Sequence, residues 1–243
     1  MIRRAVAADF PSEYPTESAL RIGGLKEAYG IDVPFIQFFT DGEGSLLSVM
    51  DGVGVFYAAV PITEEWESFI AFYPSISRLH TDEKSGNRIA NNGGWQEKSG
   101  VVLHFEGEAP SVEPPVTHAP SLPAVHTLLS ACFDSFPPLE SWYVDVSHRV
   151  RHGHCLVAAV MDEEKPVSVA LTVAQAGRGA LLGQVATHAD YRRRGYAGLC
   201  INSLIYRLQG KDLYILPAND TAASLYKTLG FCPCGGWAEL TRI

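Results

Sequence analysis

Residues 185–201 read VATHADYRRRGYAGLCI, and the rest of the chain is organised around this stretch. It begins at the end of an apolar run, residues 180–185, that is typical of a buried strand. From Tyr196 onward, apolar residues recur at the spacing of the buried side of an amphipathic helix. Three arginines and Gly195 stand between the two. We therefore predict a strand, a tight polar turn and a helix, in that order.

Such a turn is suited to binding a phosphate group. The first backbone N–H groups of a helix have no partner inside the helix, and the helix dipole is positive at that end. Gly195 has no side chain to keep a ligand away from the backbone, and Arg192–Arg194 add positive charge. The Walker pattern is absent because no Gly-Lys-Ser/Thr follows. The dinucleotide pattern is absent because only Gly195 and Gly198 occur where three spaced glycines are needed.

A second pattern follows at residues 213–231, LYILPANDTAASLYKTLGF. An apolar strand is expected at 213–216. Asn219 or Asp220 can cap a short helix over 221–229, and Gly230 is a typical residue at the end of a helix.

Together the two patterns resemble the GNAT N-acetyltransferase superfamily. The residues Arg192-x-x-Gly195-x-Ala197 match the Gln/Arg-x-x-Gly-x-Gly/Ala signature of that superfamily. The run from Asn219 through Ala222, Tyr226 and Gly230 to Phe231 resembles its other hallmark. The resemblance covers the second half of the chain. It implies an α+β fold in which a mixed, mostly antiparallel sheet is flanked by helices.

The resemblance also implies an N-acyltransferase that moves an acetyl or other acyl group from acetyl-CoA to a primary amine. The backbone at Val185, Ala186 and Thr187 would pair with the pantetheine arm as an added strand. Asn219 would help to hold that arm, and Tyr226 would protonate the departing CoA thiolate. The pyrophosphate would be held by the turn and helix start, which consist of Arg192, Arg193, Arg194, Gly195, Tyr196 and Ala197.

An amine can attack a thioester directly, so the reaction needs positioning more than a covalent intermediate. A backbone N–H, which we assign to Val185, can stabilise the oxyanion. The general base is not identified, because residues 181–185 contain no acid. Four side chains or a water relay are alternatives, and the side chains are Asp145, His148, His188 and Glu239.

Other interpretations of the same residues stay open. Tyr226 can be a packed aromatic side chain, and three arginines can be a solvated patch. The chain can also be a non-catalytic acyl-CoA-binding or regulatory module. Nucleic-acid binding through Arg192–Arg194 is disfavoured by the net charge of −8, since such proteins favour basic surfaces.

Composition limits the remaining choices. With 47% hydrophobic residues the chain can bury a core, and no apolar stretch is long enough for a membrane span. The five cysteines lack a regular spacing, which indicates a reducing, cytoplasmic location. His152 with His154 and Cys232 with Cys234 lack zinc-ligand spacing, so no metal is expected. The expected partner is a small-molecule or peptide amine, with no nucleic acid or membrane, and a homodimer is left open.

The chain is expected to have two domains. Residues 1–108 read as a smaller α+β domain, with a helix over 13–29, a second helix from Thr63 and short strands. We interpret it as a degenerate copy of the GNAT fold or an unrelated module. Residues 109–122 are rich in proline and read as an extended linker. Residues 123–243 read as the acetyl-CoA-binding domain, with helices over 124–136 and 139–150, then three antiparallel strands over 154–161, 167–174 and 180–187.

Overall fold

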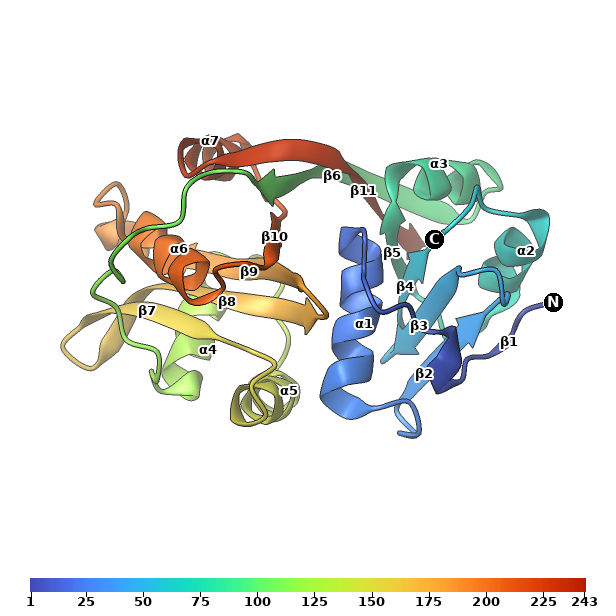
Figure 1. The fold of residues 1–243 in the computed structure, drawn as a ribbon, viewed down its shortest axis with the longest axis horizontal. Coiled ribbons are helices and arrows are strands. Elements are labelled where there is room, and N and C mark those ends of the chain that lie inside the picture. The colour runs from blue at the N-terminus through green and yellow to red at the C-terminus, as the bar shows by residue number, and fades with distance from the viewer. The chain divides into compact units, whose positions relative to one another are not determined.

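The computed structural model describes all 243 residues and divides them into two compact units (Figure 1). Unit 1 comprises Met1–Leu103 and Pro233–Ile243, and unit 2 comprises His104–Cys232. Both units combine helices with a sheet, so the α+β fold class is confirmed.

Unit 1 contains three helices and a sheet of mostly antiparallel strands. The helices are α1 (Glu17–Tyr29), α2 (Glu64–Phe72) and α3 (Glu83–Asn91), and Ala7–Asp9 forms one 3-10 turn. The strands are β1 (Arg3–Arg4), β2 (Ile36–Thr40), β3 (Leu46–Met50), β4 (Val53–Tyr57), β5 (Arg78–Asp82), β6 (Trp95–Phe105) and β11 (Phe231–Arg242). Their order is β1-β2-β3-β4-β5-β11-β6, and the one parallel pair is β4 with β5.

The two faces of this sheet carry separate apolar clusters because strand side chains alternate between faces. Ile22 of α1 packs with Phe38 of β2 and Val55 of β4 on one face. On the other face, Trp66 and Ile70 of α2 pack with Phe56 of β4. Figure 1 shows α1 on one side of these strands and α2 with α3 on the other.

The last strand of the chain belongs to unit 1. β11 pairs antiparallel with β5, with Leu240 opposite Leu79. Leu240 is fully buried in the cluster around Trp66, and the Arg242 guanidinium donates to the carbonyls of Ile70, Tyr73 and Ile76. The predicted domain 123–243 therefore differs from the compact unit, because the sheet of unit 1 takes up the C-terminal strand.

Unit 2 contains four helices and a sheet with one parallel pair. The helices are α4 (Leu122–Cys132), α5 (Leu139–Arg151), α6 (Tyr196–Arg207) and α7 (Asp220–Thr228), with a 3-10 turn at Ala189–Tyr191. The strands are β7 (Val157–Asp162), β8 (Lys165–Ala176), β9 (Gly179–Thr187) and β10 (Asp212–Ile215), in the order β10-β9-β8-β7, with the last residues of β6 next to β10. The three predicted antiparallel strands are confirmed as β7, β8 and β9.

The sheet of unit 2 is covered on both faces. Leu129 of α4 and Trp142 of α5 pack with Val157, Val169 and Ala186 of the strands. Helix α6 contacts β7, β8 and β9, and Figure 1 shows it on the face opposite to α4 and α5. None of the helices combines the length and apolar character needed to cross a bilayer.

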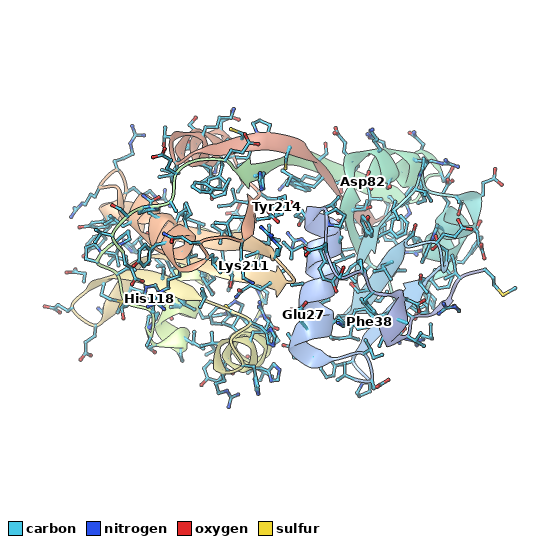
Figure 2. The ribbon with its side chains drawn as sticks, viewed as in Figure 1. Glu27, Phe38, Asp82, His118, Lys211 and Tyr214 are labelled. Carbon is cyan, nitrogen blue, oxygen red and sulfur yellow. The ribbon has the colours of Figure 1, made fainter.

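The proline-rich residues 109–121 form no helix and no strand beyond one bridge at Thr117, and they are bonded to unit 2. His118 (Figure 2) donates a hydrogen bond from Nδ1 to the Val157 carbonyl at 2.8 Å, and Thr117 pairs with Ala159 of β7. Glu113 forms an ion pair with Arg207 of α6 at 2.6 Å. The division between the units therefore falls before this segment, at Leu103 and His104, and not within residues 109–122.

Candidate active site

Strand β9, the 3-10 turn and helix α6 follow each other in the predicted order (Figure 1). Gly195 is the N-cap of α6, with φ +81° and ψ 0°, a left-handed conformation that favours glycine. No side chain caps this helix, and its first turn contains no acidic residue. The first N–H groups of α6 are therefore left for an external acceptor.

The arginines arrange the turn and leave it positive. Arg192 Nε donates to the Thr187 carbonyl at 3.2 Å, and Arg194 Nη2 donates to the Asp190 carbonyl at 3.1 Å. The Arg194 guanidinium also lies 5.1 Å from the centre of the Tyr191 ring. Arg193 has a positive φ of 64°, and all three arginines are exposed. The turn therefore holds three exposed cations beside the uncapped helix end.

The N-cap position of α6 faces open space. A Cβ atom placed on Gly195 would meet no atom within 4 Å. Tyr196 and Ala197 are half-buried beside it. An anion can therefore approach the first-turn N–H groups without displacing a side chain.

Strand β9 runs past its parallel neighbour. The pairing of β9 with β10 ends at Leu182 opposite Ile215. The predicted residues Ala186 and Thr187 lie beyond that point and pair with β8 on the other side, while Val185 lies in a register shift and has no one-to-one partner on β8. The edge of β9 at 183–187 thus has no partner on the β10 side, which is the arrangement that adding a ligand as a strand requires.

Asn219 is the residue that caps α7, and Asp220 follows it inside the helix. Asn219 Oδ1 accepts a hydrogen bond from the Ala222 N–H at 3.0 Å. The amide oxygen of Asn219 is therefore engaged within the chain, and its NH₂ group is the part left to hold a ligand.

Tyr226 lies on the buried side of α7 and is 5% exposed. Its ring centre is 6.3 Å from that of Phe231. Burial raises the pKa of Tyr226 to about 12, with no contribution from a hydrogen bond. A Cβ on Gly198 of α6 would lie 3.9 Å from Leu229, so the end of α7 approaches the start of α6.

The family model described as Acetyltransferase (GNAT) family matches residues 122–231. Residues 122–231 form a GNAT acetyltransferase domain. This match confirms the resemblance on the predicted half of the chain. The strand, turn and helix described above lie within the matched residues. No curated protein matches the chain.

Solved structures resemble the chain over nearly its whole length. A Drosophila protein has 15% identity and a TM-score of 0.65, covering 100% of this chain and 98% of its own. A GCN5-related N-acetyltransferase from Sphaerobacter thermophilus has 14% identity and a TM-score of 0.59, covering 99% and 94%. A tandem GNAT protein from the clavulanic acid biosynthesis pathway has 14% identity and a TM-score of 0.58, covering 97% and 90%. At these identities the likeness is one of fold, and it includes unit 1.

Unit 1 repeats the strand, helix and strand of the GNAT domain. In unit 1, α2 joins the parallel strands β4 and β5, as α6 joins β9 and β10 in unit 2. The order of a strand, the helix from Thr63 and a strand was expected from the sequence, but the parallel pairing of β4 with β5 was not, because strand pairing depends on residues far apart in the chain. It agrees with a degenerate copy of the fold, which was one of the two interpretations of the first half.

The repeat in unit 1 differs from the GNAT domain at the start of its helix. Thr63 caps α2 by accepting from the Trp66 N–H, and three glutamates, Glu64, Glu65 and Glu67, stand in its first turn. A cavity of about 340 Å³ lies between the β4–α2 loop and the start of α3 near Asp82. Arg88, which lines this cavity, forms an ion pair with Glu67. Unit 1 therefore offers a capped, acidic helix start where unit 2 offers an uncapped, basic one.

The alternatives for the general base differ in what surrounds them. Asp145 forms an ion pair with Arg149, with Arg149 Nε 2.9 Å from Asp145 Oδ1, so the negative charge of Asp145 is compensated by this arginine. The His148 ring centre lies 4.2 Å from that of His152. His188 Nδ1 accepts from the Asp190 N–H at 3.3 Å. Glu239 stands on β11 in unit 1, opposite His80.

Proposed function

We propose that this chain is an N-acyltransferase that transfers an acetyl or other acyl group from acetyl-CoA to a primary amine. The observation that supports this most strongly is the uncapped start of α6, with Gly195 open and three exposed arginines beside it, directly after a strand that runs past its neighbour. A diphosphate joined to an extended arm suits both features, because its anion fits the helix end and its amides can pair with the strand edge.

In the proposed reaction, the amine nitrogen attacks the thioester carbonyl carbon and the carbon–sulfur bond breaks. The Val185 N–H donates to the oxygen that becomes negative. The nitrogen loses a proton to a base or to water, and the sulfur receives one. Holding the amine and the thioester in the reactive geometry lowers the activation free energy by roughly 7–11 kcal/mol at best.

Tyr226 is the proposed proton donor. Because burial raises the pKa of Tyr226, its hydroxyl stays protonated at neutral pH and can donate to the departing sulfur. The same shift makes Tyr226 a weaker acid than a free tyrosine, so the hydrogen bond forms before the proton moves. Transfer is completed only as negative charge builds on sulfur.

The proposed acceptor is an amine of a small molecule or a peptide. The net charge of −8 favours the approach of a cationic amine. The five cysteines are free, which suits a reducing compartment, and we place the reaction in the cytoplasm. No group of three or more His, Cys, Asp or Glu side chains is placed to hold a metal ion.

A second candidate is a non-catalytic acyl-CoA-binding module. It is favoured by the lack of an acid in residues 181–185 and by the pairing of Asp145 with Arg149. Two measurements separate the candidates: isothermal titration with acetyl-CoA, and thiol release with a panel of primary amines. Binding with thiol release supports the enzyme, binding without release supports the module, and no binding at millimolar acetyl-CoA contradicts both.

A further inference from the structure

Gln184 has an unusual backbone conformation for its place in the fold. Its φ is +49°, which is left-handed and is unfavourable for a residue with a side chain. The other non-glycine residues with positive φ, namely Asp51, Glu163 and Arg193, lie in turns, whereas Gln184 lies within strand β9. A strained residue inside a strand persists only where its surroundings hold it.

The strain belongs to a bulge in β9. Gly183 pairs with Leu171 of β8 and Ala186 pairs with Val169, so Gln184 and Val185 together oppose the single residue Ala170. A bulge of this kind re-aims the peptide groups next to it. It begins two residues after Leu182, where the parallel pairing with β10 ends. The bulge therefore sets the direction of the backbone at Val185.

The side chain of Gln184 is held by helix α5. The indole N–H of Trp142 donates to Gln184 Oε1 at 3.1 Å. Trp142 is 4% exposed, and its ring centre lies 5.5 Å from that of His126 and 6.0 Å from that of Phe136. Because packing fixes the indole, its N–H is a rigid donor aimed at the bulge.

The same helix holds the irregularity on the neighbouring strand. β8 pairs Thr172 with Leu182 and Ala174 with Leu181, which leaves Val173 without a residue opposite it. Arg149 Nη1 donates to the Val173 carbonyl at 3.1 Å. Arg149 is 9% exposed and is paired with Asp145. Two side chains of α5 thus bind β8 and β9 at the points where their pairing is irregular.

We propose that Trp142 is a positioning residue for the acyl transfer. Through Gln184 it holds the β9 bulge, and the bulge directs the Val185 N–H toward the thioester oxygen. This inference rests on the proposed function. Without the indole donor, Gln184 relaxes toward an extended φ and the Val185 peptide group turns away. Ala186 and Thr187 stay paired with β8 beyond the bulge, and the diphosphate site at residues 195–197 follows the next turn. Most of the proposed CoA contacts are therefore kept, and the chemical step slows more than CoA binding weakens.

The test compares Trp142→Phe, Gln184→Met and the double variant with the wild type. Trp142→Phe removes the donor and keeps an aromatic ring, and Gln184→Met removes the acceptor without changing the α5 core. Each single variant is expected to lower kcat by about tenfold to a hundredfold, because the Val185 N–H is no longer aimed at the thioester oxygen. The Kd for CoA stays within about twofold, and the double variant is no slower than the slower single variant, because both remove one hydrogen bond.

Trp66→Phe is the matched control. Trp66 is also buried, and its indole N–H donates to Asp41 Oδ2 at 2.8 Å, but it lies in unit 1. This variant loses an indole hydrogen bond of the same kind and is expected to keep the wild-type kcat. The proposal is overturned if Trp142→Phe and Trp66→Phe have equal kcat, or if the two losses multiply in the double variant. A wild type that neither binds CoA nor releases thiol contradicts the proposed function instead.

Discussion

The Glu17 carboxylate of α1 lies 2.7 Å from Nε2 of His80 on β5, with both side chains buried in unit 1. Arg21, one turn along α1, also pairs with Glu17. The Trp237 ring stacks on the His80 ring, with centres 5.8 Å apart. Burial acts to raise the pKa of Glu17, but the charge of Arg21 and the hydrogen bond and charge of His80 outweigh it and lower the pKa to about 2.

This relationship predicts a loss of stability in acid. The folded pKa of Glu17 lies below its ordinary value of 4.5, so the stabilisation is present above about pH 4.5 and is lost as pH falls toward 2. Glu17→Gln removes it and is expected to lower the free energy of unfolding by about 3 kcal/mol at pH 7. The difference in the free energy of unfolding between the wild type and Glu17→Gln should be smaller at pH 3 than at pH 7, as measured by urea unfolding. A difference that is constant with pH would contradict the lowered pKa.

Gly195→Ala is expected to weaken acetyl-CoA binding at least tenfold. The added methyl group meets no protein atom, but it stands where a phosphate approaches the N–H groups of α6. Gly210→Ala is the matched control, because Gly210 has φ +83°, also faces open space and lies after the other end of α6. Both variants carry a left-handed alanine and lose about 1 kcal/mol of stability. Titration calorimetry that finds equal Kd values in the two variants argues against phosphate binding at Gly195.

Tyr226→Phe is expected to lower kcat by about a hundredfold while the Kd for acetyl-CoA is unchanged, since only the proton donor is lost. Because the pKa of Tyr226 is about 12, its ionisation should not limit the rate below about pH 10. Tyr57→Phe is a control, because burial also raises the pKa of Tyr57, on β4 of unit 1. Thiol release that is unchanged in Tyr226→Phe would identify Tyr226 as a packed aromatic side chain only.

Leu240→Ala is expected to destabilise unit 1 by about 2–5 kcal/mol, because it leaves a cavity in the cluster that holds Trp66 and Trp95. Thr241 is its exposed neighbour on β11, and Thr241→Ala should change the stability by less than about 0.5 kcal/mol. Denaturant unfolding followed by tryptophan fluorescence measures both. Equal midpoints would mean that β11 is not part of the core of unit 1.

Local signals in the sequence predicted the elements that carry the candidate site. The apolar run before Val185, the glycine at 195 and the apolar spacing after Tyr196 placed β9, the turn and α6. They succeeded because a strand end, a left-handed glycine and a helix start each depend on neighbouring residues. The capping of α7 by Asn219 follows from equally local chemistry.

Other features were missed because their signals are weak or distant. Helix α3 was not predicted, since Ile89 is the one large apolar side chain it buries. Strand β11 is continuous from Phe231 to Arg242. Its pairing with β5 joins residues more than 150 positions apart in the chain, which no local pattern reports. The bulge at Gln184 likewise depends on Trp142, forty-two positions away.

By itself, the sequence determined that a strand, a glycine turn rich in arginine and an amphipathic helix follow one another, because each depends on side chains a few positions apart. Tertiary structure alone decided three features: β9 extends beyond its pairing with β10, Trp142 of α5 is hydrogen-bonded to the bulge, and the last strand joins the sheet of unit 1. These features arise where backbone groups remote in sequence must find hydrogen-bond partners, and only the folded chain brings those groups together.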